Sequence, residues 1–142
     1  MTLTRDRRTE LLGAAPLFTG VDEAGLGMVA ERAIEVDFAP GQVIARQGDV
    51  GTGFFIVASG SVRVVRDGAT IATLGPGEFF GELSVLDGQP RNAQVVAAEP
   101  TTCLALASWD FEAIVTEDPK VALAVMRGLA GRLRGLTEAL RH

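Results

Sequence analysis

Paired turn residues recur through the middle of this chain, and their spacing limits the possible folds more than any other feature of the sequence. The pairs begin 8, 11, 8, 9, 11 and 12 residues apart, and short apolar runs fill most of the intervals. Short runs between regularly spaced turn residues are typical of an antiparallel β-sandwich or β-barrel. The turn pairs are Pro40-Gly41, Gly48-Asp49, Ser59-Gly60, Asp67-Gly68, Pro76-Gly77, Asp87-Gly88 and Glu99-Pro100.

The apolar runs between these turns predict strands. In the segment 61–64 polar and apolar side chains alternate, so one face of that strand should be buried and the other should face water. Asp67-Gly68 lies between two such runs and favours a type I′ hairpin turn. The predicted strands cover residues 43–45, 54–57, 62–65, 70–74, 94–98 and 102–106.

Helical periodicity marks both ends of the chain. A short helix should end before Pro16, and Asp22 is placed to cap a second helix. After the strands, Ser108 is placed to cap a third helix. Asp118-Pro119 then opens a long helix that reaches Leu140.

The length of 142 residues and the 47% share of hydrophobic residues suit one globular domain with a single core. We therefore expect a single domain over residues 1–142. Its parts are N-terminal helices at 1–33, a β-barrel at 34–107 and C-terminal helices at 108–141.

Composition excludes several classes of protein. The net charge of −5 opposes binding to nucleic acid, because an acidic surface repels phosphate backbones. Cys103 is the single cysteine and His142 the single histidine, which leaves no Cys/His cluster for zinc and no histidine-based catalytic centre. Neither a membrane-spanning run nor a signal-peptide core occurs, so we expect no membrane contact and a cytoplasmic protein.

An apolar stripe runs along the last predicted helix. Met126, Leu129, Leu133, Leu136 and Leu140 follow one another at steps of 3, 4, 3 and 4 residues, which is heptad spacing over two heptads. Two interpretations are open. The stripe packs against the strands of its own chain, or it pairs with a second copy to form a homodimer.

The chemistry of the chain is concentrated in residues 79–93. Gly81-Glu82-Leu83-Ser84 is typical of a helix that begins directly after a strand, where free backbone N–H groups attract an anion. Gly81 leaves room for a close approach. Arg91, fixed by Pro90, offers a planar fork suited to a phosphate, while Glu82 is better suited to a sugar hydroxyl. Together they indicate a site for a sugar that carries a singly charged phosphate.

This segment resembles the phosphate-binding cassette of the cyclic nucleotide-binding domain family, in Phe80-Gly81-Glu82-Leu83-Ser84 and in Pro90-Arg91-Asn92-Ala93. Gly48-Asp49, the run 54–57 and Gly60-Ser61-Val62 resemble earlier strands of that family. The resemblance implies a mainly β fold, an eight-stranded antiparallel β-barrel of jelly-roll type with helices at both termini. It also implies a non-catalytic sensor that binds cAMP or cGMP, needs no cofactor and signals to an effector protein.

The resemblance also implies a role for each site residue. Glu82 would bind the ribose 2′-hydroxyl and Arg91 the cyclic phosphate, with the backbone N–H groups of Leu83, Ser84 and Ala93 completing the phosphate cradle. The final helix would close over the base through Arg132, Leu133 or Leu136. The base pocket would be lined by Val62, Val64, Ile71 and Leu74.

The position after the arginine departs from the family pattern. Members commonly carry Ala, Ser or Thr there, whereas this chain has Asn92, which can donate to the phosphate or to a purine edge. The choice between cAMP and cGMP is therefore open, with cAMP placed first.

Other functions stay open to different degrees. The same fold could serve as a ligand-free structural or dimerisation domain in which Glu82 and Arg91 pair with each other, or the chain could be a regulatory fragment of a larger protein. An enzyme acting on a cyclic nucleotide would need a metal cluster or a general base, and the sequence offers neither beside Arg91. A transcription factor would need a helix-turn-helix after the last helix.

Overall fold

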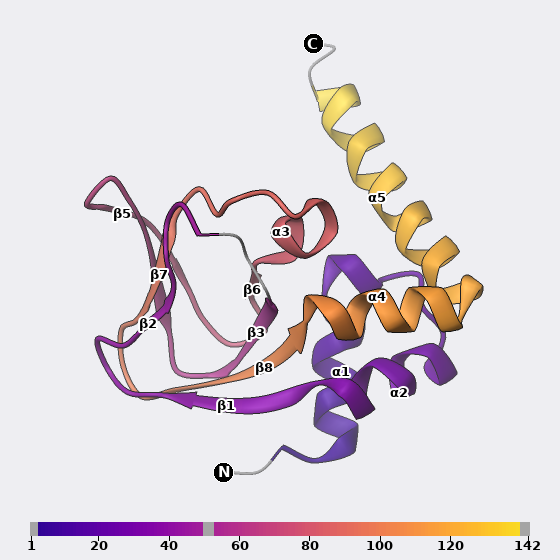
Figure 1. The fold of residues 1–142 in the computed structure, drawn as a ribbon, viewed down its shortest axis with the longest axis horizontal. Coiled ribbons are helices and arrows are strands. Elements are labelled where there is room, and N and C mark those ends of the chain that lie inside the picture. Colours follow the sequence, from indigo (N-terminus) through magenta and orange to yellow (C-terminus); the bar gives the residue numbers. More distant parts are fainter. Residues whose placement is uncertain (1–2, 50–52, 140–142) are drawn as a thin grey trace.

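The computed structural model describes residues 3–49 and 53–139, and the side chains of residues 82–84 and 139 lie outside that description. Along the sequence, eight strands separate the N-terminal helices from the C-terminal helices, and in space these two groups of helices lie together on one side of the strands (Figure 1). The strands are β1 (Ile34–Phe38), β2 (Val43–Ala45), β3 (Gly53–Ser59), β4 (Val62–Arg66), β5 (Ala69–Leu74), β6 (Phe79–Phe80), β7 (Gln94–Ala97) and β8 (Thr101–Ala107). The helices are α1 (Arg5–Ala14), the 3-10 helix η1 (Pro16–Phe18), α2 (Glu23–Arg32), α3 (Glu82–Asp87), α4 (Ser108–Glu117) and α5 (Pro119–Ala139).

The strands form two four-stranded antiparallel sheets, in the orders β1-β8-β3-β6 and β2-β7-β4-β5. The predicted eight-stranded antiparallel jelly roll with helices at both ends is therefore confirmed, as two sheets rather than one closed ring. Each predicted strand occurs. β1 was not among the predicted strands, because no pair of turn residues separates it from α2.

The two central strands of the sheet β1-β8-β3-β6 are buried on both faces, which explains the continuous apolar runs of β3 and β8. Successive side chains of a strand point to opposite faces. Phe54 and Ile56 therefore pack beneath the helices, in the same cluster as Phe18 and Phe111. Val57 faces the other way, into a second cluster between the two sheets.

One face of the second sheet, β2-β7-β4-β5, is exposed to solvent. Arg63 on β4 is exposed, whereas its neighbour Val62 is completely buried, as the alternation in the sequence predicts. The predicted turn at the end of β4 is confirmed, because both Asp67 (φ 51°) and Gly68 (φ 82°) have the positive φ of a type I′ turn.

Three of the predicted helix boundaries are confirmed and one is corrected. α5 begins at Pro119, as Asp118-Pro119 predicts. α1 ends before Pro16, and the Asp22 side chain caps α2 by accepting from the Gly25 N–H at 2.8 Å. Ser108 is the first residue of α4 rather than its cap. The capping position is Ala107, whose side chain cannot accept a hydrogen bond.

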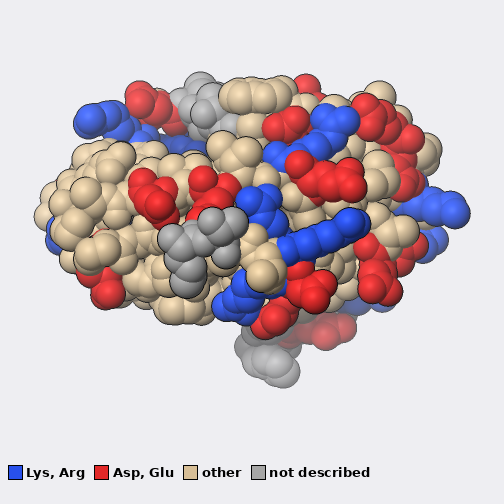
Figure 2. All heavy atoms as spheres, turned by 90° about the horizontal axis from the view of Figure 1, so that it is seen from below, with Lys and Arg blue, Asp and Glu red and all other residues tan. Residues whose placement is uncertain are grey.

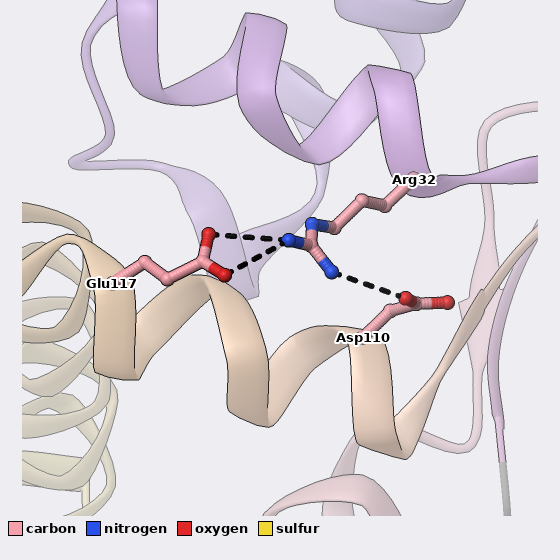
Figure 3. Close-up of polar contacts among 3 residues, drawn as sticks. All are labelled: Arg32, Asp110 and Glu117. Carbon is pink, nitrogen blue, oxygen red and sulfur yellow. Dashed lines mark hydrogen bonds and ion pairs between the residues drawn. The ribbon is translucent and has the colours of Figure 1, made fainter.

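The N-terminal helices are tied to α4 through one arginine. Arg32, at the end of α2, lies between the first and last turns of α4 (Figure 3). Its guanidinium contacts Asp110 at 3.4 Å and both carboxylate oxygens of Glu117 at 3.1 Å. All three side chains are partly exposed, so water and salt screen these ion pairs.

Replacing Arg32 with alanine is expected to lower the free energy of unfolding by about 1 kcal/mol, since each partly exposed ion pair contributes ~0.2–1 kcal/mol. Urea unfolding at low salt and at 1 M salt measures the effect, which should shrink at high salt. Arg7→Ala is the control, because Arg7 pairs with Glu10 inside α1 and links no two elements. Equal losses in the two variants, unaltered by salt, would show that Arg32 does not join α2 to α4.

The two halves of α5 differ in burial. Val121 and Val125 are buried near its start, whereas Met126, Leu133 and Leu136 are 58%, 65% and 64% exposed. Figure 1 shows the last turns of α5 standing clear of both sheets. The interpretation in which the stripe packs on its own strands is therefore wrong for these three residues, and Leu140 lies outside the described residues. No helix in the described part of the chain is long and apolar enough to cross a membrane.

Candidate functional site

A cavity of about 390 Å³ opens beside residues 79–93, between this segment and strands β4, β5 and β7. That volume lies within the range of small-ligand sites. The described residues that line it come from the segment 79–93 and from these three strands. They are Val64, Leu74, Phe79, Phe80, Gly81, Asp87, Gln89, Pro90, Arg91, Asn92, Ala93 and Val95.

Arg91 is the charged centre of this cavity. Its side chain is half-buried, and its Nη2 donates a hydrogen bond to the Gly53 carbonyl at 2.8 Å. Desolvation by burial lowers the pKa of the Arg91 guanidinium from its ordinary value, because burial penalises the charged form. Among the described side chains no carboxylate lies within ion-pair distance of it. The cavity therefore presents a positive charge with donors left for an anion.

Gly81 is required by the approach of Arg91. Its φ of +89° is one that other residues rarely adopt. A Cβ at this position would lie 2.5 Å from the Gly53 carbonyl oxygen and 2.8 Å from Arg91 Nη1. The sequence predicted a close approach by a ligand, and the structure adds that the protein itself already fills this space.

Helix α3 begins directly after β6 and Gly81, as predicted. Its first described hydrogen bond runs from the Val85 N–H to the Gly81 carbonyl at 3.2 Å. A helix start leaves its first amides without partners inside the helix. The side chains of Glu82, Leu83 and Ser84 lie outside the description, so the ribose contact of Glu82 and its alternative pairing with Arg91 stay predictions.

The structure places two of the four predicted base-pocket residues on the cavity. Val64 and Leu74 line it. Val62, which lies two residues earlier on β4, is completely buried in the core between the sheets. Ile71 is 50% exposed, as its neighbours on β5 before Leu74 are exposed, and it lies at the register shift between β4 and β5. Val62 and Ile71 are therefore not among the described residues that line the cavity.

Several lining residues were not predicted as site residues. Phe80 stacks on Phe55 with ring centroids 5.0 Å apart and forms part of the apolar wall. Asp87 accepts the Gln89 N–H at 2.9 Å and shapes the turn after α3. Phe80 and Asp87 both lie inside the segment 79–93. Their position in this motif is the sequence feature that could have identified them as lining residues.

The predicted closure of the site by α5 is not seen. Arg132, Leu133 and Leu136 are exposed on the outer half of α5, and none of them is among the described residues of the cavity. α5 packs instead against α4 and η1 at its first turns. The described part of α5 therefore does not cover the cavity.

Charges on the outer surface are mixed. Figure 2 shows Lys and Arg side chains interspersed with Asp and Glu side chains over the face seen from below. No continuous basic surface occurs on the described part of that face. Such mixed charge does not attract a phosphate backbone in the way that a basic stripe does.

Comparisons with known proteins agree with this geometry. The chain is 39% identical over 125 residues to a cyclic AMP receptor protein of Thermus thermophilus, covering 84% of this chain and 58% of the receptor. It is 38% identical over 130 residues to a cyclic nucleotide-gated potassium channel of Mesorhizobium japonicum, covering 91% of this chain and 36% of the channel. The chain thus spans less than two thirds of the length of each of these relatives.

A solved structure matches almost the whole chain. The N-terminal domain of a transcriptional regulator from Streptomyces coelicolor superposes with a TM-score of 0.84 at 33% identity, covering 93% of this chain and 96% of that domain. The profile of the cyclic nucleotide-binding domain matches residues 35–118, which run from β1 to the residue before α5 and include the whole cavity. The chain therefore belongs to the cyclic nucleotide-binding domain family.

Proposed function

We propose that this chain is the ligand-sensing module of a regulatory protein and that it acts by binding a cyclic nucleotide, not by catalysis. We propose cAMP as the preferred ligand and cGMP as the alternative ligand. The observation that carries the proposal is Arg91, a half-buried guanidinium at a cavity of about 390 Å³, with no described carboxylate within ion-pair distance of it. A cyclic phosphate supplies one negative charge and two free oxygens, which suit a planar fork.

The relatives support this proposal by what their names say they bind, cyclic AMP in one case and cyclic nucleotides in the other. Both are longer than this chain, which fits a module that regulates an attached or separate effector protein. The cytoplasmic location stays a prediction from the sequence.

The route from the cavity to the rest of the molecule runs through α3. Val85 of α3 is buried in the same cluster as Phe111 and Ile114 of α4. A ligand that draws the start of α3 toward its phosphate would therefore shift the packing of α4, which leads directly into α5. Such a ligand transmits a signal only if it binds one arrangement of α4 and α5 more tightly than another.

Saturating cAMP is expected to raise the melting temperature of the protein. A ligand at ~100 times its dissociation constant adds about 2.7 kcal/mol to the stability of the folded state. For a chain of this size that corresponds to a rise of roughly 5–10 °C. Differential scanning fluorimetry with cAMP and cGMP in parallel measures the shift and ranks the two ligands.

Adenosine and 5′-AMP are the matched controls for this titration. Adenosine lacks the phosphate, and 5′-AMP lacks the ring that holds the phosphate at a single charge, so both should shift the melting temperature much less. An absence of any shift with either cyclic nucleotide at millimolar concentration would favour the ligand-free structural domain.

A further inference from the structure

The tip of the hairpin between β4 and β5, made of Arg66 and Asp67, contacts both the segment that contains Arg91 and a loop that is bonded to Arg91. Arg66 Nε donates to the Asn92 carbonyl at 3.1 Å. Asp67 and Gln47 form a reciprocal pair, in which Gln47 Nε2 donates to Asp67 Oδ1 at 3.0 Å and the Asp67 N–H donates to Gln47 Oε1 at 3.2 Å. The hairpin tip is thus bonded both to the residue after Arg91 and to the loop 46–49.

The loop 46–49 in turn holds the backbone of Arg91 on both sides. The Gly48 N–H donates to the Arg91 carbonyl at 2.8 Å, and the Arg91 N–H donates to the Asp49 carbonyl at 2.7 Å. A turn closes the loop, with the Asp49 N–H donating to the Arg46 carbonyl at 3.3 Å. The hairpin tip is therefore connected to the backbone at 91–92 in two ways. Arg66 bonds directly to the Asn92 carbonyl, and Asp67 is connected to the Arg91 backbone through the loop 46–49.

The fold explains why the hairpin tip reaches this place. Val62, Val64 and Arg66 occupy alternate positions of β4 and so share one face. Val62 lies in the core and Val64 lines the cavity, which places Arg66 next along the same face toward the cavity rim. The positive φ of Asp67 belongs to the tight turn, and Asp tolerates this conformation better than most residues do.

We infer that Arg66, Asp67 and Gln47 are positioning residues of the nucleotide site, which fix the backbone at 91–92 so that the guanidinium of Arg91 and the following amide meet the phosphate together. This inference rests on the proposed function. The three residues lie outside the segment 79–93 and are exposed, so each contact competes with water and contributes modestly. The side-chain bonds of Arg66 and Asp67 each have one charged partner, but water and salt screen a charge on an exposed side chain, so loss of one such bond corresponds to about a threefold to tenfold loss of affinity.

Paired variants separate positioning from folding. Arg66→Ala removes the donor to Asn92, and Arg66→Lys keeps a donor. Asp67→Gly removes the carboxylate but suits the positive φ of the turn, while Asp67→Asn keeps both the turn and an acceptor for Gln47. Arg63→Ala is the control, since Arg63 is an exposed arginine on the same strand whose side chain faces the other way.

The first measurement is the affinity for cAMP and for its two phosphorothioate diastereomers by isothermal titration calorimetry. We expect Arg66→Ala and Asp67→Gly to lose about threefold to tenfold in affinity and to alter the preference between the diastereomers, which reports the geometry around the phosphate. Arg66→Lys and Asp67→Asn should recover most of the loss, and Arg63→Ala should match the parent. A substitution that only destabilised the fold would leave the diastereomer preference unchanged.

The second measurement needs no ligand. Hydrogen exchange of the Gly48 and Arg91 amides, both donors in the contacts described above, should accelerate in Arg66→Ala and Asp67→Gly but not in Arg63→Ala. If the parent binds cAMP and the variants match it in affinity, diastereomer preference and exchange, the inference is overturned. If the parent binds no cyclic nucleotide, the proposed function fails, and the exchange rates alone decide whether the hairpin tip holds Arg91.

Discussion

Replacing Arg91 with alanine is expected to lower the affinity for cAMP by about one to two orders of magnitude while the protein stays folded. The substitution removes the charged group at the cavity and the donor to the Gly53 carbonyl. Charge-assisted hydrogen bonds are worth ~1.5–3 kcal/mol, and each 1.4 kcal/mol is about tenfold in binding. Isothermal titration calorimetry measures the affinity, and a thermal melt of the free variant measures its stability.

Three further variants show which property of Arg91 matters. Arg91→Gln keeps an amide donor that can reach toward Gly53 but removes the charge. Arg91→Lys keeps the charge but replaces the fork with a single ammonium, so we expect it to bind more weakly than the parent. Arg63→Ala matches the charge change of Arg91→Ala on an exposed residue outside the cavity and should bind as the parent does. Parent-like affinity in Arg91→Lys would refute the paired-fork geometry, and parent-like affinity in Arg91→Ala would remove Arg91 from the site.

The centre of the site could be predicted because its parts are close together in the sequence. Gly81 and Arg91 are ten residues apart, and the conformational freedom of one and the planar fork of the other are properties of the residue types themselves. The structure brings them into contact over the Gly53 carbonyl. That third partner was not predicted, because a backbone carbonyl has no signature in the sequence.

The surroundings of the site depend on tertiary structure and could not be predicted. Gln47 and Asp67 are 20 residues apart, and Arg66 and Asn92 are 26 apart, so only the pairing of distant strands brings them together. Ile71 is a different case. It lies three residues before Leu74 on β5, so regular alternation already places the two side chains on opposite faces, and the structure leaves Ile71 exposed while Leu74 lines the cavity.

The fold itself was largely predictable from local signals. Each turn pair around Pro40, Asp67 and Pro76 includes a glycine at positive φ, so the turn chemistry alone placed the ends of several strands. β1 was missed because no turn pair separates it from α2, although its residues Ile34–Phe38 alternate between apolar and polar side chains as a strand does. The same local reasoning left the stripe on α5 with two interpretations, since periodicity identifies an apolar face without identifying what covers it.

The protein is expected to self-associate weakly through α5. Met126, Leu133 and Leu136 are more than half exposed, and they stand on one face at heptad spacing. Gly131 and Gly135 each weaken an isolated helix by ~1 kcal/mol relative to alanine. The outer half of α5 is thus marginal on its own, and pairing with a second copy would bury the stripe and stabilise the helix at the same time.

Sedimentation velocity at several protein concentrations, with and without cAMP, measures this association. Leu133→Glu/Leu136→Glu should abolish it, because both substitutions place like charges in the paired stripe while keeping good helix formers. Arg127→Gln/Arg134→Gln is the matched control, since it also lowers the net charge by two and leaves the stripe intact. The control should associate as the parent does.

The response to nucleotide decides whether association and sensing are coupled. If ligand binding shifts α4 through Val85, the first turns of α5 shift with it, and the dimer constant should change when cAMP is added. By linkage, the monomeric variant Leu133→Glu/Leu136→Glu should then differ from the parent dimer in its affinity for cAMP, and filling both sites of the dimer should change the dimer constant by the square of that per-site factor. A parent that is monomeric at all concentrations, with cAMP affinity unaltered by the double substitution, would leave the stripe without a role in dimerisation.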